Sequence, residues 1–95
     1  MKTKVIFRKF PSRNGGEVIA LFPEIPADHR GNIGSYMRTG QHGAASPDLG
    51  RSLRLATPEE YEPLKRELER IGYILDVKTR SCPAYAKARR EALAR

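Results

Sequence analysis

A single stretch of the chain, Thr57 to Gly72, carries a complete set of helix signals. Thr57 and Glu60 form a capping box, in which each side chain accepts a hydrogen bond from the backbone N–H of the other residue. Pro58 stands at the first helical position, and Gly72 is the expected left-handed terminator. One apolar stripe follows the helical period: Tyr61, Leu64, Leu68 and Ile71. The sequence therefore predicts one well-specified helix that buries one side.

Pro63 is the one residue in this stretch that opposes a regular helix. It removes the hydrogen bond to the Glu59 carbonyl, so we expect a bent or partly 3₁₀ start and a regular helix from residue 63 onward.

Two strands and a turn are predicted at the beginning of the chain. Lys4–Phe10 and Val18–Phe22 are rich in β-branched and aromatic residues, and residues 11–16 between them have turn composition. The first strand carries Lys and Arg, which predicts an edge position, whereas the second is apolar on both faces and predicts a central one.

The middle of the chain reads as two long irregular stretches, residues 23–34 and 39–50, which are separated by a short strand at 35–38. We expect Ile25 to anchor the first stretch to the core. Residues 51–56 alternate apolar Leu53 and Leu55 with polar residues, as a half-buried strand does.

The last part of the chain predicts a closing strand at 73–77 and a weaker helix from Pro83 to Arg95, whose apolar face is mostly Ala. The fold class is therefore α+β: a small, mostly antiparallel sheet of four to five strands, with one main helix on one face and a weaker C-terminal helix. We expect residues 1–77 to form one compact domain and residues 78–95 a basic, loosely docked helical tail.

Composition limits the class of protein. The chain has 95 residues, 39% of them apolar, which allows one small domain with a core. No apolar run is long enough to span a membrane, and Arg8 and Lys9 interrupt the N-terminal apolar run that a signal peptide needs. The single cysteine, Cys82, makes no intramolecular disulfide. These features predict a cytoplasmic protein without a membrane partner.

Five segments of the chain taken together resemble a group of short bacterial proteins associated with phages, plasmids and other mobile elements. The resemblance spans roughly residues 4–77, and its most specific parts are Ala20–Glu24 and Gly40–Gly43. It implies an accessory role that involves host or element machinery. No activity is established for the group, so the resemblance assigns no functional residue.

The segment around His42 is the first candidate site. His42 lies between Gly40 and Gly43, and a histidine titrates near neutrality. No nucleophile or second carboxylate is tied to it, so we predict a loop that binds a partner rather than an enzyme. The residues predicted to contact that partner are Tyr36, Arg38, Gln41 and His42.

A metal or cofactor site is not expected. Asp28, His29, His42 and Asp48 lack the spacing of a metal site, and Asp28 reads as a turn former beside an exposed His29. Cys82 precedes a helix start and reads as a cap or packing residue, and no phosphate-binding loop is present.

Positive charge is concentrated at the two ends of the chain. The net charge is +7, of which residues 1–13 contribute +5, residues 78–95 contribute +5 and the middle contributes −3. If both ends lie on one side, they form a surface for phosphates, with Tyr85 stacking on a base. The predicted nucleic-acid-binding residues are Lys4, Arg8, Lys9, Arg13, Lys78, Arg80, Tyr85, Lys87, Arg89 and Arg90.

Three functions remain after this reading. The first is a small non-enzymatic binding protein, monomeric or weakly dimeric, that acts on a protein or nucleoprotein partner. The second is direct nucleic-acid binding without sequence preference through the basic ends. The third is an enzyme that uses His42 of the Gly40–Gly43 segment.

Overall fold

A mixed sheet with helices on both faces forms the protein in the computed structural model, which describes residues 2–38 and 41–94. The strands are β1 (Thr3–Lys9), β2 (Val18–Pro26), β3 (Ile33–Met37), β4 (Gln41–Ala45), β5 (Arg54–Leu55) and β6 (Leu75–Lys78). The helices are α1 (Pro47–Ser52), α2 (Pro58–Arg70) and α3 (Pro83–Leu93), with a 3₁₀ turn, η1 (Ser12–Asn14). The α+β class is therefore confirmed.

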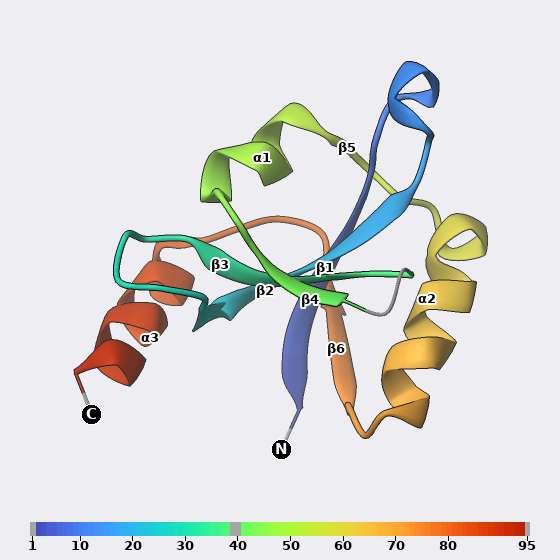
Figure 1. Ribbon diagram of the computed structural model, residues 1–95. Coiled ribbons are helices and arrows are strands. Elements are labelled where there is room, and N and C mark those ends of the chain that lie inside the picture. Colours follow the sequence, from blue (N-terminus) through green and yellow to red (C-terminus); the bar gives the residue numbers. More distant parts are fainter. Residues whose placement is uncertain (1, 39–40, 95) are drawn as a thin grey trace.

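The sheet has the order β4-β3-β2-β1-β5, and β6 also pairs with β1. All pairings are antiparallel except that of β1 with β6, which is parallel. Helix α2 lies on one side of the sheet, and α1 and α3 lie on the other (Figure 1).

Strand β1 is central, and the prediction of an edge position was wrong. Its first half pairs with β6 and its second half with β5, while β2 occupies its other side. Its basic side chains did not indicate an edge because they bond within the fold. Lys4 pairs with Glu24, Arg8 donates to the Leu53 carbonyl and Lys9 pairs with Glu60.

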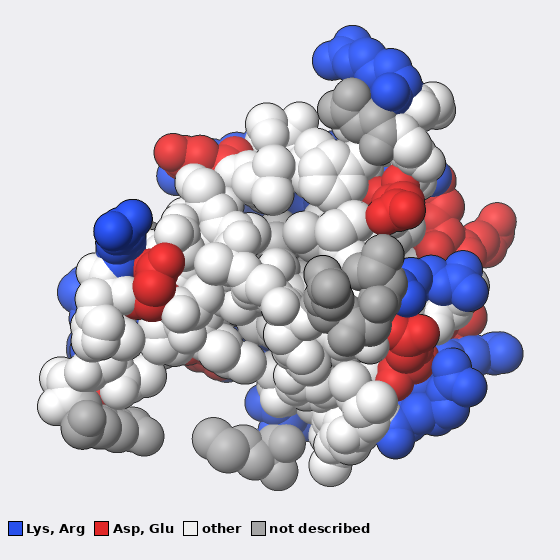
Figure 2. Space-filling view, in the orientation of Figure 1, with Lys and Arg blue, Asp and Glu red and all other residues white. Residues whose placement is uncertain are grey.

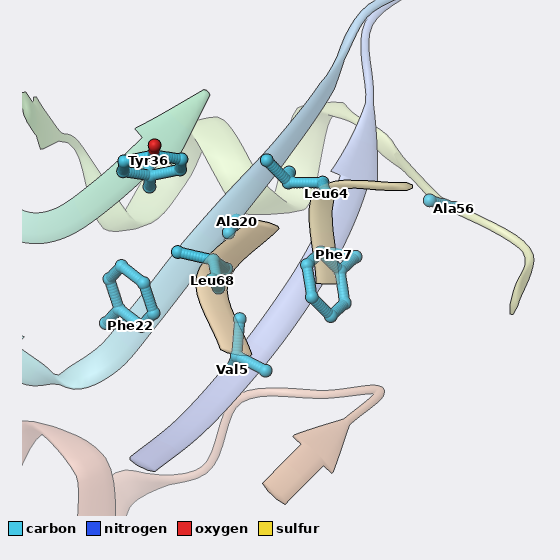
Figure 3. Close-up of a cluster of buried hydrophobic side chains, with 8 residues drawn as sticks. All are labelled: Val5, Phe7, Ala20, Phe22, Tyr36, Ala56, Leu64 and Leu68. Carbon is cyan, nitrogen blue, oxygen red and sulfur yellow. The ribbon is translucent and has the colours of Figure 1, made fainter. Parts of the chain in front are cut away.

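The main core lies between the sheet and α2. Leu64 and Leu68 point from the helix onto Val5, Phe7 and Phe22 (Figure 3). The ring of Tyr61 stacks on that of Phe7, with the centroids 4.4 Å apart. A second cluster covers the opposite face, toward α1: Ile19, Leu21, Ile33, Ala45 and Leu53.

Helix α2 begins with the predicted capping box at Thr57 and Glu60, and Gly72 follows it with a φ of 116°. The expected 3₁₀ start before Pro63 was wrong, because the α-helix is continuous from Pro58. Pro63 and Glu59 are both exposed, so water can bond the carbonyl that loses its partner. Ile71 follows the last helical residue and is 53% exposed, so it does not extend the buried stripe.

The two stretches predicted to be irregular contain regular structure. Strand β2 continues to Pro26 through a register irregularity between Phe22 and Pro26, which accommodates two prolines without ladder donors. Ile25 is 39% exposed rather than anchored in the core. Residues 41–52 form β4 and α1 instead of a loop.

Two further expectations change in detail. The strand predicted at 51–56 is reduced to β5, since α1 extends to Ser52, and Leu55 is exposed while Leu53 is buried. The closing strand is present as β6, which begins at Leu75 rather than at residue 73 and runs one residue past the expected domain boundary at 77. The C-terminal helix is present as α3, which ends at Leu93.

Candidate partner-binding edge

Strand β4 is an edge of the sheet and carries no protective charge. It pairs with β3 on one side and has no other strand neighbour among the described residues. Its sequence contains no Lys, Arg, Asp, Glu or Pro, and His42, Gly43 and Ala44 are exposed. Natural sheet edges usually carry such residues to prevent pairing with another chain. Strand β6, which also has an open side, carries Asp76 and Lys78.

The prediction of a loop at Gly40–Gly43 was therefore wrong where the structure describes it, from Gln41 onward; Thr39 and Gly40 lie outside the described residues. Gly and Ala have low β-propensity, so the local pattern did not indicate a strand. The strand forms because this segment pairs with β3, with Tyr36 opposite His42 and Ser35 opposite Gly43.

Two of the predicted partner-binding residues, Tyr36 and His42, meet on the α2 side of the sheet. Their rings contact edge to face, with the centroids 4.7 Å apart. The Tyr36 hydroxyl donates a hydrogen bond to Oε2 of Glu67 in α2 at 2.6 Å. That bond to a carboxylate, together with burial, raises the pKa of Tyr36.

His42 also contacts Tyr73, which sequence reasoning did not single out. Nε2 of His42 lies 2.9 Å from the Tyr73 hydroxyl, and the Tyr73 ring stacks on Phe22 at 5.2 Å. Gly72 reverses the chain after α2, and the Tyr73 N–H then bonds the Leu68 carbonyl. The sequence did offer one signal for Tyr73: it follows the helix-terminating Gly72, and a residue in that position often packs back on the core.

An open hollow of about 300 Å³ lies beside β4 on this side of the sheet. Its lining is mostly apolar and comes from β2, β3, β4 and the segment after α2: Phe22, Ile25, Gly34, His42, Ala44 and Tyr73. Gly34 keeps the hollow open, since a Cβ at this position would project into it and lie 3.4 Å from the Ile25 side chain.

The other two predicted partner-binding residues do not join this group. Arg38 lines a groove with Glu59, Glu62 and Arg66 along α2. Gln41 lies in β4, and its side chain is outside the described part of the structure.

Charged side chains are scarce on this face of the molecule. The middle of the view toward β4 is mostly white, and Lys, Arg, Asp and Glu gather toward its margins (Figure 2). The surface over β3 and β4 is therefore suited to contacts through backbone and apolar groups rather than to ion pairing.

The basic ends of the chain come together only in part: Lys4 and Arg8 of β1 lie beside Tyr85 and Arg89 of α3, but the tip of the hairpin does not. The hairpin tip with η1 and helix α3 lie at opposite ends of the molecule (Figure 1). Several of the predicted phosphate-binding groups have partners within the fold: Lys4 with Glu24, Lys9 with Glu60, Lys78 with Asp76, Lys87 with Glu91, Arg8 with the Leu53 carbonyl and Arg89 with the Pro23 carbonyl. Arg13, Arg80 and Arg90 are exposed.

Tyr85 does not lie on the surface, so the prediction that it stacks on a base was wrong. It is 7% exposed, and Lys4 lies 5.9 Å from its ring centroid. Tyr85 packs in the contact of α3 with the sheet because it is the one large aromatic side chain of that helix.

Metal-ligating chemistry is not assembled in residues 2–38 and 41–94, where no group of three or more His, Cys, Asp or Glu side chains is placed to hold an ion. Asp28 is the turn former that the sequence predicted. It accepts hydrogen bonds from the Asn32 side chain and from the Arg30 and Asn32 backbone N–H groups, which lower its pKa. His29 is exposed beside it.

Comparisons with protein-family models, with curated proteins and with solved structures give no match. None of the described helices is long and apolar enough to cross a membrane. What the protein does is therefore argued from the geometry of β4 and its surroundings.

Proposed function

We propose that this protein is a small non-enzymatic binding protein whose β4 edge accepts an extended strand from a partner protein. The observation that carries the proposal is that β4 is an exposed edge without charge or proline. Main-chain hydrogen bonds to such an edge supply affinity without requiring a particular partner sequence.

The hollow beside β4 supplies the selectivity. Side chains of an added strand alternate between the two faces of the sheet, so every second one projects toward the side on which His42 and Ala44 lie. The lining by Phe22, Ile25 and Tyr73 suits an apolar side chain at that position. The partner segment is therefore an uncharged extended strand with one apolar anchor.

His42 fixes one wall of the hollow. Its imidazole is held between the Tyr36 ring and the Tyr73 hydroxyl, which in turn is held by the stacking of Tyr73 on Phe22. A preformed wall of this kind lowers the ordering cost of binding. In an accessory protein of a mobile element, which the resemblance implies, such an edge would engage a host or element protein.

The experiment uses a displayed library of short random peptides, selected on the whole chain. We expect the enriched peptides to carry apolar residues at alternating positions. Ala44→Glu places an unpaired carboxylate where the partner strand would pair with β4. It is expected to weaken the binding of a synthetic enriched peptide by about tenfold or more. Ala92→Glu is the matched control, because it makes the same change at an exposed position on α3.

Three outcomes contradict the proposal: no enriched peptide, equal weakening by Ala44→Glu and Ala92→Glu, or a peptide that binds Ala44→Glu as tightly as the wild type. Light scattering of the free protein adds a fourth. A stable dimer that Ala44→Glu converts to monomers would mean that a second copy of the chain, and not a partner, occupies the edge.

A further inference from the structure

Three arginines that are distant in sequence line one pocket on the side of the sheet away from α2. They are Arg8 in β1, Arg51 in α1 and Arg89 in α3, and Ser81 adds a hydroxyl from the segment before α3. The remaining walls are largely apolar and include Ile6, Leu21 and Ile33. No Asp or Glu is among the described residues that line it.

Two of the guanidinium groups are held in place by backbone carbonyls. Nη1 of Arg8 donates to the Leu53 carbonyl at 3.1 Å, and Nη1 of Arg89 donates to the Pro23 carbonyl. Each guanidinium has five N–H donors, so these bonds fix the groups and leave further donors for a ligand.

The Arg8 side chain contains a buried donor without an acceptor. Its Nε is shielded from solvent, and none of the described residues accepts its hydrogen. A buried, unsatisfied donor on a charged group costs free energy, and native structures rarely leave one without a partner. An anion in the pocket, bound through the remaining Nη donors of Arg8, would balance the charge of this guanidinium.

Arg51 is placed to complete the site from the solvent side. Its side chain is 77% exposed and pairs with Asp48, which is 81% exposed. An exposed pair of this kind contributes little, so Arg51 exchanges that carboxylate for a stronger anion at small cost.

The size of the pocket selects the ligand. It offers about 40 Å³ and is largely enclosed, which is room for about three waters or for one small tetrahedral anion. We infer that this pocket binds a phosphate group, either as inorganic phosphate or as the terminal phosphate of a monoester, through Arg8, Arg51 and Arg89. A phosphodiester carries two substituents and a single negative charge, so a pocket of about 40 Å³ lined by three arginines favours the smaller and more highly charged monoester.

The inference stands apart from the proposed β4 edge, because the two sites lie on opposite faces of the sheet. Neither depends on the other, and each has its own variants.

The test follows the Arg8 Nε–H signal by nitrogen-15 NMR during titration of the whole protein with four salts at matched ionic strength. Inorganic phosphate and methyl phosphate are expected to shift that signal saturably, and dimethyl phosphate and chloride are not. A shift with inorganic phosphate alone would restrict the ligand to the free ion. Equal shifts with dimethyl phosphate would overturn the assignment to a terminal phosphate.

Substitutions separate a built site from general electrostatic attraction. Arg51→Gln and Arg89→Gln are each expected to weaken methyl phosphate binding by roughly tenfold, because each removes a charge-assisted hydrogen bond. Arg13→Gln removes the same charge at the exposed hairpin tip and is expected to leave binding unchanged. An unshifted Arg8 Nε–H signal, or equal weakening by Arg13→Gln and Arg51→Gln, would overturn the inference.

Discussion

The hydroxyl of Tyr36 donates a hydrogen bond to Oε2 of Glu67 at a distance of 2.6 Å. This contact joins β3, the neighbour of the free edge, to the helix that covers the core. The Tyr36 ring also supports His42 on β4. One residue therefore links the main core to the surface proposed to bind a partner.

Removal of the Tyr36 hydroxyl measures how much its hydrogen bond to Glu67 stabilises the fold. Tyr36→Phe is expected to destabilise the fold by the value of one hydrogen bond to a charged acceptor, since Glu67 loses its buried donor. Urea unfolding at neutral pH measures the change. Tyr61→Phe is the control and should be close to neutral, because Tyr61 contacts Phe7 through its ring and its hydroxyl bonds none of the described residues.

The same bond predicts a loss of stability at alkaline pH. The pKa of Tyr36 is raised above its ordinary value of 10.0, since the neutral phenol is the form that donates to Glu67. Its contribution is complete below pH 10 and is lost as the pH rises through the raised pKa. Unfolding free energies of wild type and Tyr36→Phe should converge there, and a constant difference at all pH values would contradict this account.

Glu60 predicts the opposite dependence at acid pH. Two hydrogen bonds from the Arg54 guanidinium, the Thr57 N–H and the nearby charges lower the pKa of Glu60 from 4.5 to about 2. Its contribution is complete above pH 4.5 and is lost as the pH falls toward 2. With Glu60→Gln, the unfolding free energy should fall less steeply between pH 4.5 and pH 2. Glu59→Gln, at an exposed position, should leave that fall as steep as in the wild type.

Burial differs sharply between two apolar residues at the C-terminal end of α2. Leu68 is fully buried, and Leu68→Ala is expected to cost about 2–5 kcal/mol of unfolding free energy. Ile71 is 53% exposed, and Ile71→Ala is expected to change it by less than about 0.5 kcal/mol. Denaturant unfolding of both variants compares them directly, and similar losses would mean that the stripe continues past α2.

Helix α3 is expected to contribute to the stability of the whole domain. Tyr85 is buried against the sheet, so Tyr85→Ala should cost about 2–5 kcal/mol and lower the protection of β2 amides from hydrogen exchange. Lys87→Ala, at an exposed position of the same helix, is the control. A loss of protection confined to α3 would instead support the loosely docked tail that the composition of this helix suggests.

The elements that depend on neighbouring residues were predictable from the sequence. The capping box and the glycine terminator define α2, and the hairpin of β1 and β2 follows from its turn and its β-branched residues. In the hairpin turn, Gly15 and Gly16 have φ of 96° and 66°, values that other residues seldom adopt.

The features that depend on distant residues were not predictable. Nothing in residues 3–9 indicates that β5 and β6 complete the ladder beside β1, because those strands come from far along the chain. Strand β4 exists through its pairing with β3 rather than through its own propensity. The arginine pocket arises in the same way, since only the topology brings Arg8, Arg51 and Arg89 together.

The most direct test of the central claim is an isotope-edited NMR spectrum of the whole protein bound to an enriched peptide. Strand addition predicts intermolecular backbone contacts between the peptide and residues 41–45, with slowed amide exchange along β4 and a peptide side chain near Tyr73 and Phe22. Contacts only with α2, α3 or the hairpin tip, without any to β4, would contradict the claim.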